Sequence, residues 1–181
     1  MERFHIDRAA ILMIDMQTRL VPALTDPAAL VRYHQILLEL AHDDRLPVFV
    51  TEQHPKGLGP TVPELASRLP DTAAVVEKTR FTAMVPEIAD ALRRSGRQQI
   101  VVTGAETHIC VYQTVMDLLA AGYVPFVPID AVQSRTVQNR DNALALLRQA
   151  GAVITNTETL VFEALGDAKT EHFKKYSKLV R

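Results

Sequence analysis

Three residues that could do chemistry together each stand at or near the end of an apolar segment: Asp15 in AILMIDMQ, Lys78 in VVEKTRF and Cys110 in VTGAETHIC. An aspartate can take and return a proton, a lysine can hold a carboxylate through its charge, and a thiolate is a nucleophile. Cys110 is the only cysteine in the 181 residues and stands at the start of a helix-like segment. There the helix dipole is expected to lower the thiol pKa from about 8.5 toward neutrality.

Each of these residues also has an ordinary structural interpretation. A lone cysteine is usually a small buried hydrophobe, an aspartate after a strand often caps a turn, and a loop lysine is usually solvated. Asp15, however, lies among apolar residues, and a buried carboxylate needs a partner, which Lys78 can supply. Three such residues at one edge of a sheet indicate a catalytic site.

The segments that must position these residues alternate between two patterns. Apolar, β-branched runs typical of buried parallel strands occupy 9–14, 46–51, 73–77, 98–103, 123–129 and 152–155. Helical patterns lie between them: one capped by Asp26 before Pro27, and others over 86–96, about 107–122 and about 139–151, with a capping-box spacing from Thr155 to Glu158 before a further helix.

This alternation predicts one domain over residues 1–181, a three-layer α/β/α sandwich with a mostly parallel, six-stranded, Rossmann-like sheet. Ligands of such sheets bind beyond the carboxyl ends of the strands, where Asp15, Lys78 and Cys110 lie. The Pro- and Gly-rich connection 52–72 is long for its class, which indicates a functional loop.

Composition excludes several classes of protein. The formal net charge is −1 and no basic cluster exceeds HFKKYSK, expected to be the solvated end of a terminal helix, so no nucleic-acid partner is predicted. The apolar run AAILMI is too short for a signal peptide or a membrane span, and a single cysteine forms no internal disulfide. We therefore expect a cytoplasmic protein with no membrane partner.

Other site chemistries fit the sequence less well. No G-x-G-x-x-G follows a strand, no P-loop is present, and the six histidines lack the spacing of a zinc site. Spacing leaves open a Cys–His pair between Cys110 and His108 or His54. His108, however, stands two residues before Cys110 at a helix start, where the side chains face apart, and is interpreted as a packing residue.

Together, ILMIDMQ, VVEKTRFTAM and VTGAETHICVYQTVMDLL resemble the aspartate, lysine and cysteine motifs of the isochorismatase-like cysteine hydrolases, which include nicotinamidases. Segments 51–65 and 134–168 look like the isochorismatase-domain-containing subgroup. The resemblance implies an Asp15–Lys78–Cys110 triad that cleaves an amide-type bond of a small molecule through a covalent intermediate on the cysteine. It also implies a non-proline cis peptide between Ala105 and Glu106, with the backbone N–H groups of Glu106 and Cys110 forming an oxyanion hole.

One departure from the nicotinamidases concerns metal binding. Their Asp-x-His metal motif corresponds here to Gln53 and Pro55, so neither a metal nor another cofactor is expected. Gln53 could instead bind substrate or order the loop, and Phe81 could line the pocket or pack. The resemblance also implies a homo-oligomer. The alternative to a hydrolase is a non-enzymatic or redox-sensing module on the same fold.

Overall fold

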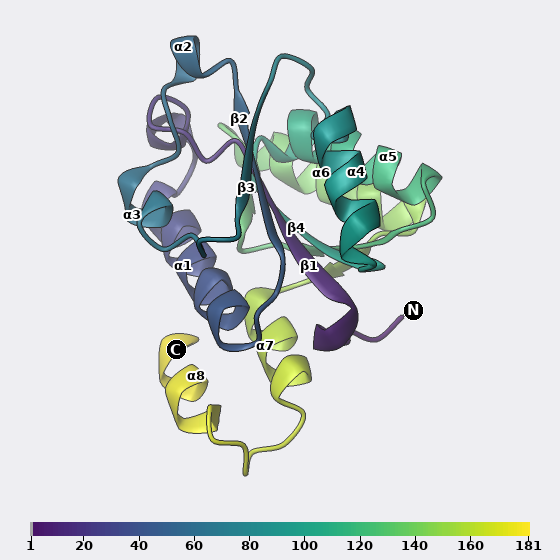
Figure 1. The fold of residues 1–181 in the computed structure, drawn as a ribbon. Coiled ribbons are helices and arrows are strands. Elements are labelled where there is room, and N and C mark those ends of the chain that lie inside the picture. Colours follow the sequence, from purple (N-terminus) through teal and green to yellow (C-terminus); the bar gives the residue numbers. More distant parts are fainter. Residues whose placement is uncertain (1) are drawn as a thin grey trace.

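The computed structural model describes residues 2–181 and shows a sheet between two layers of helices (Figure 1). Its seven strands pair in parallel, in the order β3-β2-β1-β4-β5-β7, with β6 beside β4. The strands are β1 (Ala9–Ile14), β2 (Val48–Gln53), β3 (Ala74–Lys78), β4 (Gln99–Ala105), β5 (Val124–Pro128), β6 (Val132–Gln133) and β7 (Val153–Thr155).

Two groups of helices cover the two faces of the sheet (Figure 1). One face carries α1 (Pro27–Asp43), α7 (Thr157–Leu165) and α8 (Phe173–Leu179); the other carries α4 (Pro86–Ser95), α5 (Tyr112–Ala120) and α6 (Val137–Ala150). The short helical turns are η1 (Ile6–Arg8), η2 (Val21–Ala23), α2 (Pro55–Leu58), α3 (Pro63–Ala66) and η3 (Thr107–Val111).

The central strand β1 is buried along its whole length. Because side chains alternate across a strand, its residues contribute in turn to the cores on the two faces of the sheet. Ile11 and Met13 belong to the core under α1, while Leu12 and Ile14 belong to the core under α4, α5 and α6. Gly104 of β4 lies directly beside Ile14 with φ +108°, and a Cβ there would meet the Ile14 carbonyl oxygen at 2.0 Å. Glycine is therefore required where β4 approaches the end of β1.

The predicted fold class is confirmed, and all six predicted strands are present with ends shifted by at most two residues. The two-residue strand β6 was not predicted, because so short a segment has no periodicity to detect. The Asp26 cap of α1 is confirmed, since its side chain accepts from the Ala29 N–H, and the predicted glycine ends of α4 and α6 are left-handed.

Some predicted ends were wrong. Thr155 does not cap α7, because it pairs with β5 as the last residue of β7; Asn156 caps the helix and accepts from the Thr159 N–H at 2.7 Å. The helix predicted from about Asn139 already begins at Val137, capped by Thr136. The segment predicted as one helix over 107–122 divides into the π-helical turn η3 and the α-helix α5.

The two remaining segments are more ordered than the sequence suggested. The long connection 52–72 folds into α2 and α3, and Thr61 bridges to Gln17 after β1. The helix α8, expected to be a solvated end, buries Tyr176 against the core, with its hydroxyl donating to Asp43 of α1. Within residues 2–181, no helix combines the length and the apolar character needed to cross a membrane.

Candidate active site

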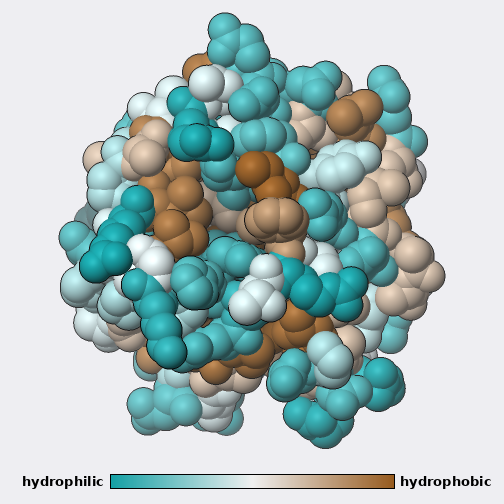
Figure 2. Space-filling model, turned by 90° about the horizontal axis from the view of Figure 1, so that it is seen from above, coloured by the Kyte–Doolittle hydropathy of each residue, from teal (hydrophilic) through white to brown (hydrophobic). Residues whose placement is uncertain are grey.

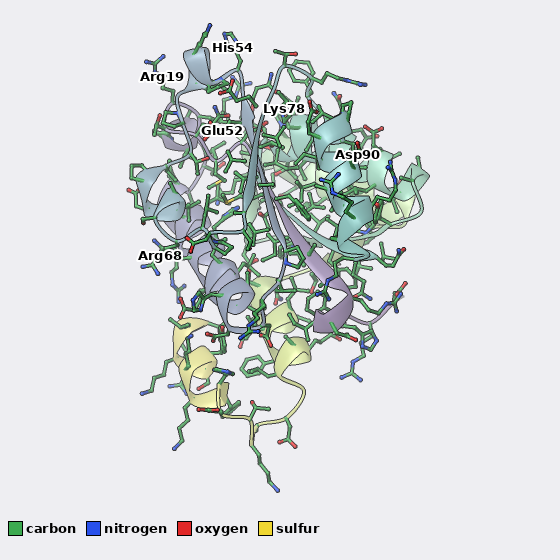
Figure 3. All side chains as sticks on the ribbon, in the orientation of Figure 1. Arg19, Glu52, His54, Arg68, Lys78 and Asp90 are labelled. Atoms are coloured by element: carbon green, nitrogen blue, oxygen red, sulfur yellow. The ribbon has the colours of Figure 1, made fainter. Side chains whose placement is uncertain are left out.

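The carboxyl edge of the sheet brings together Asp15 after β1, Lys78 at the end of β3 and Cys110 after β4. The strand β1 pairs with β4, and β2 lies between β1 and β3. Figure 3 shows Lys78 in the upper part of the sheet, below His54, with Glu52 on the neighbouring strand. Figure 2 looks onto this edge, where apolar side chains gather among polar ones.

Asp15 and Lys78 form a fully buried ion pair. The Lys78 Nζ lies 2.7 Å from Asp15 Oδ2, and both side chains have no solvent exposure. Thr51 of β2 donates its hydroxyl to the other carboxylate oxygen at 2.7 Å. The backbone of Asp15 has φ +53°, a left-handed conformation that non-glycine residues seldom adopt, at the end of β1. Such conformations are concentrated at functional sites.

Lys78 has more acceptors around it than its ammonium group has protons. Besides Asp15, its Nζ donates to Gln53 Oε1 at 2.8 Å, to the Phe81 carbonyl at 3.1 Å and to the Arg80 carbonyl at 3.2 Å. Since an ammonium has three N–H groups, all of them are already engaged. The lysine therefore holds Asp15 in place rather than offering a free donor to a substrate.

Two residues predicted to bind substrate have specific positions in this network. Gln53 uses its amide oxygen for Lys78 and donates its amide N–H to the Thr79 carbonyl at 2.9 Å, so it helps to hold the lysine. The Phe81 side chain is 54% exposed and does not pack in the core, while its carbonyl accepts from Lys78. Contact of either side chain with a substrate stays a prediction.

Cys110 lies in η3, where the Val111 N–H donates to the Glu106 carbonyl five residues earlier. The Asp15 carboxylate lies close enough to the thiol for the two groups to shift each other's pKa, and the Glu106 backbone N–H lowers the pKa of the thiol. The Ala105–Glu106 peptide bond is cis, as the family resemblance implied. The thiol, the Asp15 carboxylate and the Glu106 N–H thus lie close together at this edge of the sheet.

The pKa of Cys110 differs from the expectation based on its place in a helix. Burial, together with the charge of Asp15, raises the pKa of the thiol to about 12, although the charge of Lys78 opposes the shift. The expected shift toward neutrality was wrong, because burial and the neighbouring carboxylate outweigh the helix dipole. With this pKa the thiol is protonated at neutral pH.

Asp15 can accept that proton. Burial raises the pKa of its carboxyl group above 3.8, although the charge of Lys78 and the hydrogen bonds from Lys78, Thr51 and Cys110 oppose the shift. A raised pKa makes the carboxylate a stronger base, and it lies in contact with the thiol. The site therefore places a protonated thiol beside a carboxyl group of raised pKa.

His108 does not contribute to this arrangement. Its Nδ1 lies 3.0 Å from Ser134 Oγ, and its Nε2 lies 3.4 Å from Asn139 Nδ2 of α6. These contacts agree with a packing role and disfavour a Cys–His pair. His54, the other histidine considered, is exposed at the start of α2.

Comparison with known proteins identifies the family. The model of the Isochorismatase domain matches residues 9–159. The chain belongs to the isochorismatase family. Isochorismatase domain-containing protein 2 of Xenopus laevis is 38% identical over 176 residues, which cover 96% of this chain and 84% of that protein.

Several solved structures have the same fold as this chain. The MAR1 ribonuclease of Caenorhabditis elegans superimposes with a TM-score of 0.93 at 32% identity, covering 99% of this chain and 92% of that one. YcaC from Pseudomonas aeruginosa, solved with hexane-2,5-diol and covalent acrylamide, has a TM-score of 0.89 at 25% identity, covering 99% and 96%. YcaC from Escherichia coli, described as an octameric hydrolase of unknown specificity, has the same TM-score and identity, covering 99% and 95%. The chain thus has the isochorismatase-like hydrolase fold.

Sequence reasoning missed several residues around this isochorismatase-family site. Thr51 donates a hydrogen bond to Asp15, and its only sequence signal is a polar residue in a buried strand. Thr114 donates a hydrogen bond to the Cys110 carbonyl, and in the sequence it looks like part of an apolar helix. The Glu106 carboxylate accepts from Arg135 at 3.0 Å from its backbone N and 3.1 Å from its Nε. Nothing in the sequence pairs residues so far apart.

A metal centre was not predicted for this member of the family. Among residues 2–181, no three His, Cys, Asp or Glu side chains come close enough together to hold a metal ion. Gln53, which the sequence resemblance matched to a metal-binding aspartate of the nicotinamidases, accepts a hydrogen bond from Lys78.

Proposed function

We propose that this chain is a cysteine hydrolase that cleaves an amide-type C–N bond of a small molecule through a covalent intermediate on Cys110. The observation that carries the proposal is the buried Lys78–Asp15 ion pair, with the Asp15 carboxylate close enough to the Cys110 thiol for each group to shift the pKa of the other. A buried base in contact with the single thiol is the arrangement that nucleophilic catalysis requires.

In the first half-reaction the sulfur attacks the substrate carbonyl carbon while the thiol proton passes to Asp15. The C–S bond forms, and the carbonyl electrons move to the oxygen as a tetrahedral oxyanion. The Glu106 backbone N–H, which lies against the sulfur, and the Cys110 N–H are the proposed donors to this oxyanion. When the C–N bond breaks, Asp15 returns the proton to the leaving nitrogen, and a thioester remains on Cys110.

In the second half-reaction water takes the place of the leaving amine. Asp15 takes a proton from the water, whose oxygen attacks the thioester carbon. The C–S bond then breaks, the proton returns to sulfur, and a carboxylic acid is released. Lys78 keeps its contacts throughout and maintains the position and charge of Asp15.

The relatives support parts of this proposal. YcaC of Pseudomonas aeruginosa was solved with covalent acrylamide, an electrophile whose alkene adds to nucleophiles, which supports a reactive nucleophile in this fold. The octameric YcaC of Escherichia coli supports the proposal that this chain is a homo-oligomer. Light scattering at micromolar concentration tests the assembly, and a monomeric mass would contradict it.

Two further proposals concern metal and location. We propose that activity needs no metal ion, so dialysis against a chelator should leave turnover unchanged; a loss that added metal restores would refute this. We also propose a cytoplasmic location, supported by the single cysteine in 181 residues. Cell fractionation with a tagged chain tests that location.

The central experiment is a substrate panel with the parent protein and Cys110→Ser. The panel contains amides, carbamoyl compounds, esters and, because one relative is named a ribonuclease, a short RNA. We expect turnover of an amide or carbamoyl compound by the parent, loss in Cys110→Ser, and a mass increase of Cys110 on rapid quenching. RNA cleavage would replace the small-molecule proposal. No turnover of any compound would favour the redox-sensing or non-enzymatic module.

A further inference from the structure

Thr114 of α5 is a buried polar residue in an apolar helix. It stands four residues after Cys110, near Val111, Val115 and Leu118, and has no solvent exposure. Its hydroxyl donates to the Cys110 carbonyl at 2.6 Å and accepts from the Ala83 backbone N–H at 2.8 Å. The hydroxyl proton and an oxygen lone pair are therefore both engaged.

The segment to which Thr114 bonds is the same one that holds Lys78. Lys78 donates to the carbonyls of Arg80 and Phe81, and Ala83 follows two residues later. Thr114 thus closes a loop of contacts that runs from Asp15 to Lys78, along residues 80–83, and through the hydroxyl to the backbone of Cys110. This route links the base to the nucleophile independently of the pairing between β1 and β4.

The hydroxyl is not explained by helix stability. A threonine bonded to the carbonyl four residues earlier bends a helix and slightly destabilises it, while valine has the same shape and suits an apolar surface. The hydroxyl does satisfy the buried Ala83 N–H, so loss of the bond would leave that donor without a partner. Its contact pattern fits a tie between two parts of a site.

We propose that Thr114 is a positioning residue that sets the Cys110 thiol against Asp15 by tying the cysteine backbone to residues 80–83, the segment that holds Lys78. The effect of Thr114 on turnover rests on the proposed hydrolase function. Its effect on the reactivity of the Cys110 thiol does not depend on that function. The hydroxyl itself touches neither a substrate nor the sulfur, and it acts through the Cys110 carbonyl.

The test uses iodoacetamide, which reports on the thiol without any substrate. Alkylation rates of Cys110 are measured from pH 6 to 10 for the parent, Thr114→Val and Thr114→Ser. A matched control is Thr103→Val, which removes another buried hydroxyl, one that has no hydrogen-bond partner within residues 2–181. Thermal unfolding of each variant establishes a temperature at which all are folded.

We expect Thr114→Val to change the alkylation rate at pH 8 by about tenfold and to shift its pH profile, because displacements of about 1 Å have large kinetic effects. The alkylation rate of Thr114→Ser should stay near that of the parent, and the rate of Thr103→Val should match that of the parent. On an amide substrate, Thr114→Val should lower kcat with KM nearly unchanged. A parental alkylation profile in folded Thr114→Val would overturn the proposal.

A second variant guards against misfolding. If Thr114→Val does not fold, Thr114→Ala leaves room for water beside the Ala83 N–H and is measured at low temperature in the same way. The same change in rate supports the proposal, and a parental profile overturns it. If no amide is ever turned over, the hydrolase proposal fails while the alkylation result on Thr114 stands by itself.

Discussion

Two Lys–Asp pairs in this molecule have the same distance between their charged atoms, but the pKa values of their aspartates are shifted in opposite directions. In the site, Lys78 Nζ lies 2.7 Å from Asp15 Oδ2; at the junction of α8 and α1, Lys175 Nζ lies 2.7 Å from Asp43 Oδ2. Yet the pKa of Asp15 is raised above its ordinary value, and the pKa of Asp43 is lowered below it. Distance between the charges does not explain the difference.

The surroundings of the two carboxylates explain it. Burial raises the pKa of the unexposed Asp15 by more than Lys78 and Thr51 lower it. Burial also raises the pKa of Asp43, whose side chain is 12% exposed, but hydrogen bonds from Lys175 and Tyr176 outweigh that effect. An aspartate of the first kind is a base that accepts protons readily, whereas one of the second kind fastens one helix to another.

The largest expected contrast is in turnover. Asp15→Asn should reduce kcat by about 10²–10⁴-fold, the range for loss of a general base, while Asp43→Asn should leave kcat within about twofold. Both variants keep the side-chain shape, and circular dichroism checks their folding. Turnover that survives in Asp15→Asn would remove Asp15 from the proposed role.

Stability should separate the two lysines. Lys78→Met leaves a buried carboxylate without its charge partner and should lower the free energy of unfolding by about 3–5 kcal/mol, measured in urea at pH 7. Lys175→Met breaks a pair whose lysine is 35% exposed and should change the free energy of unfolding by about 1 kcal/mol or less. Equal losses would mean that burial does not distinguish the pairs.

Lys78→Met should also slow the alkylation of Cys110. Lys78 lowers the pKa of the thiol, so its removal should raise that pKa. Each unit by which the pKa rises reduces the thiolate fraction about tenfold. Lys175→Met is the matched control and should leave the alkylation rate unchanged. Faster alkylation in Lys78→Met would contradict the assigned role of the lysine.

The pH dependence of stability should have opposite signs at the two aspartates. The lowered pKa of Asp43 means that its stabilising contribution is present above 3.8 and is lost as the pH falls through the folded-state value. The raised pKa of Asp15 means that its contribution is fully present below 3.8 and is lost as the pH rises through the folded-state value. Urea unfolding of Asp15→Asn, Asp43→Asn and the parent from pH 3 to 7 measures both slopes. Identical slopes in the two variants would contradict this assignment.

The smallest expected effect is at His108. Because its ring bonds to Ser134 and Asn139, His108→Ala should change the alkylation rate of Cys110 by less than about threefold. Lys78→Met, measured in parallel, provides the scale. If the alkylation profile moves with His108→Ala and stays unchanged with Lys78→Met, a Cys–His pair replaces the proposed triad.

Much of this architecture could be predicted from sequence because it depends on local patterns. Apolar runs identified the strands and their parallel arrangement, and that arrangement placed Asp15, Lys78 and Cys110 at one edge. Prediction was weaker where two structures compete for one residue, as at Thr155, which belongs to β7 instead of capping α7.

The sequence by itself determined the chemical groups of the site and the strands that carry them. Tertiary structure decided the protonation of Cys110, the engagement of Gln53 with Lys78, and the Thr114 bridge to Ala83. The physical reason is that burial and hydrogen bonding depend on residues far apart in the chain. A helix start predicts a lowered thiol pKa, but the low-dielectric surroundings and the Asp15 charge, both supplied by folding, raise it instead.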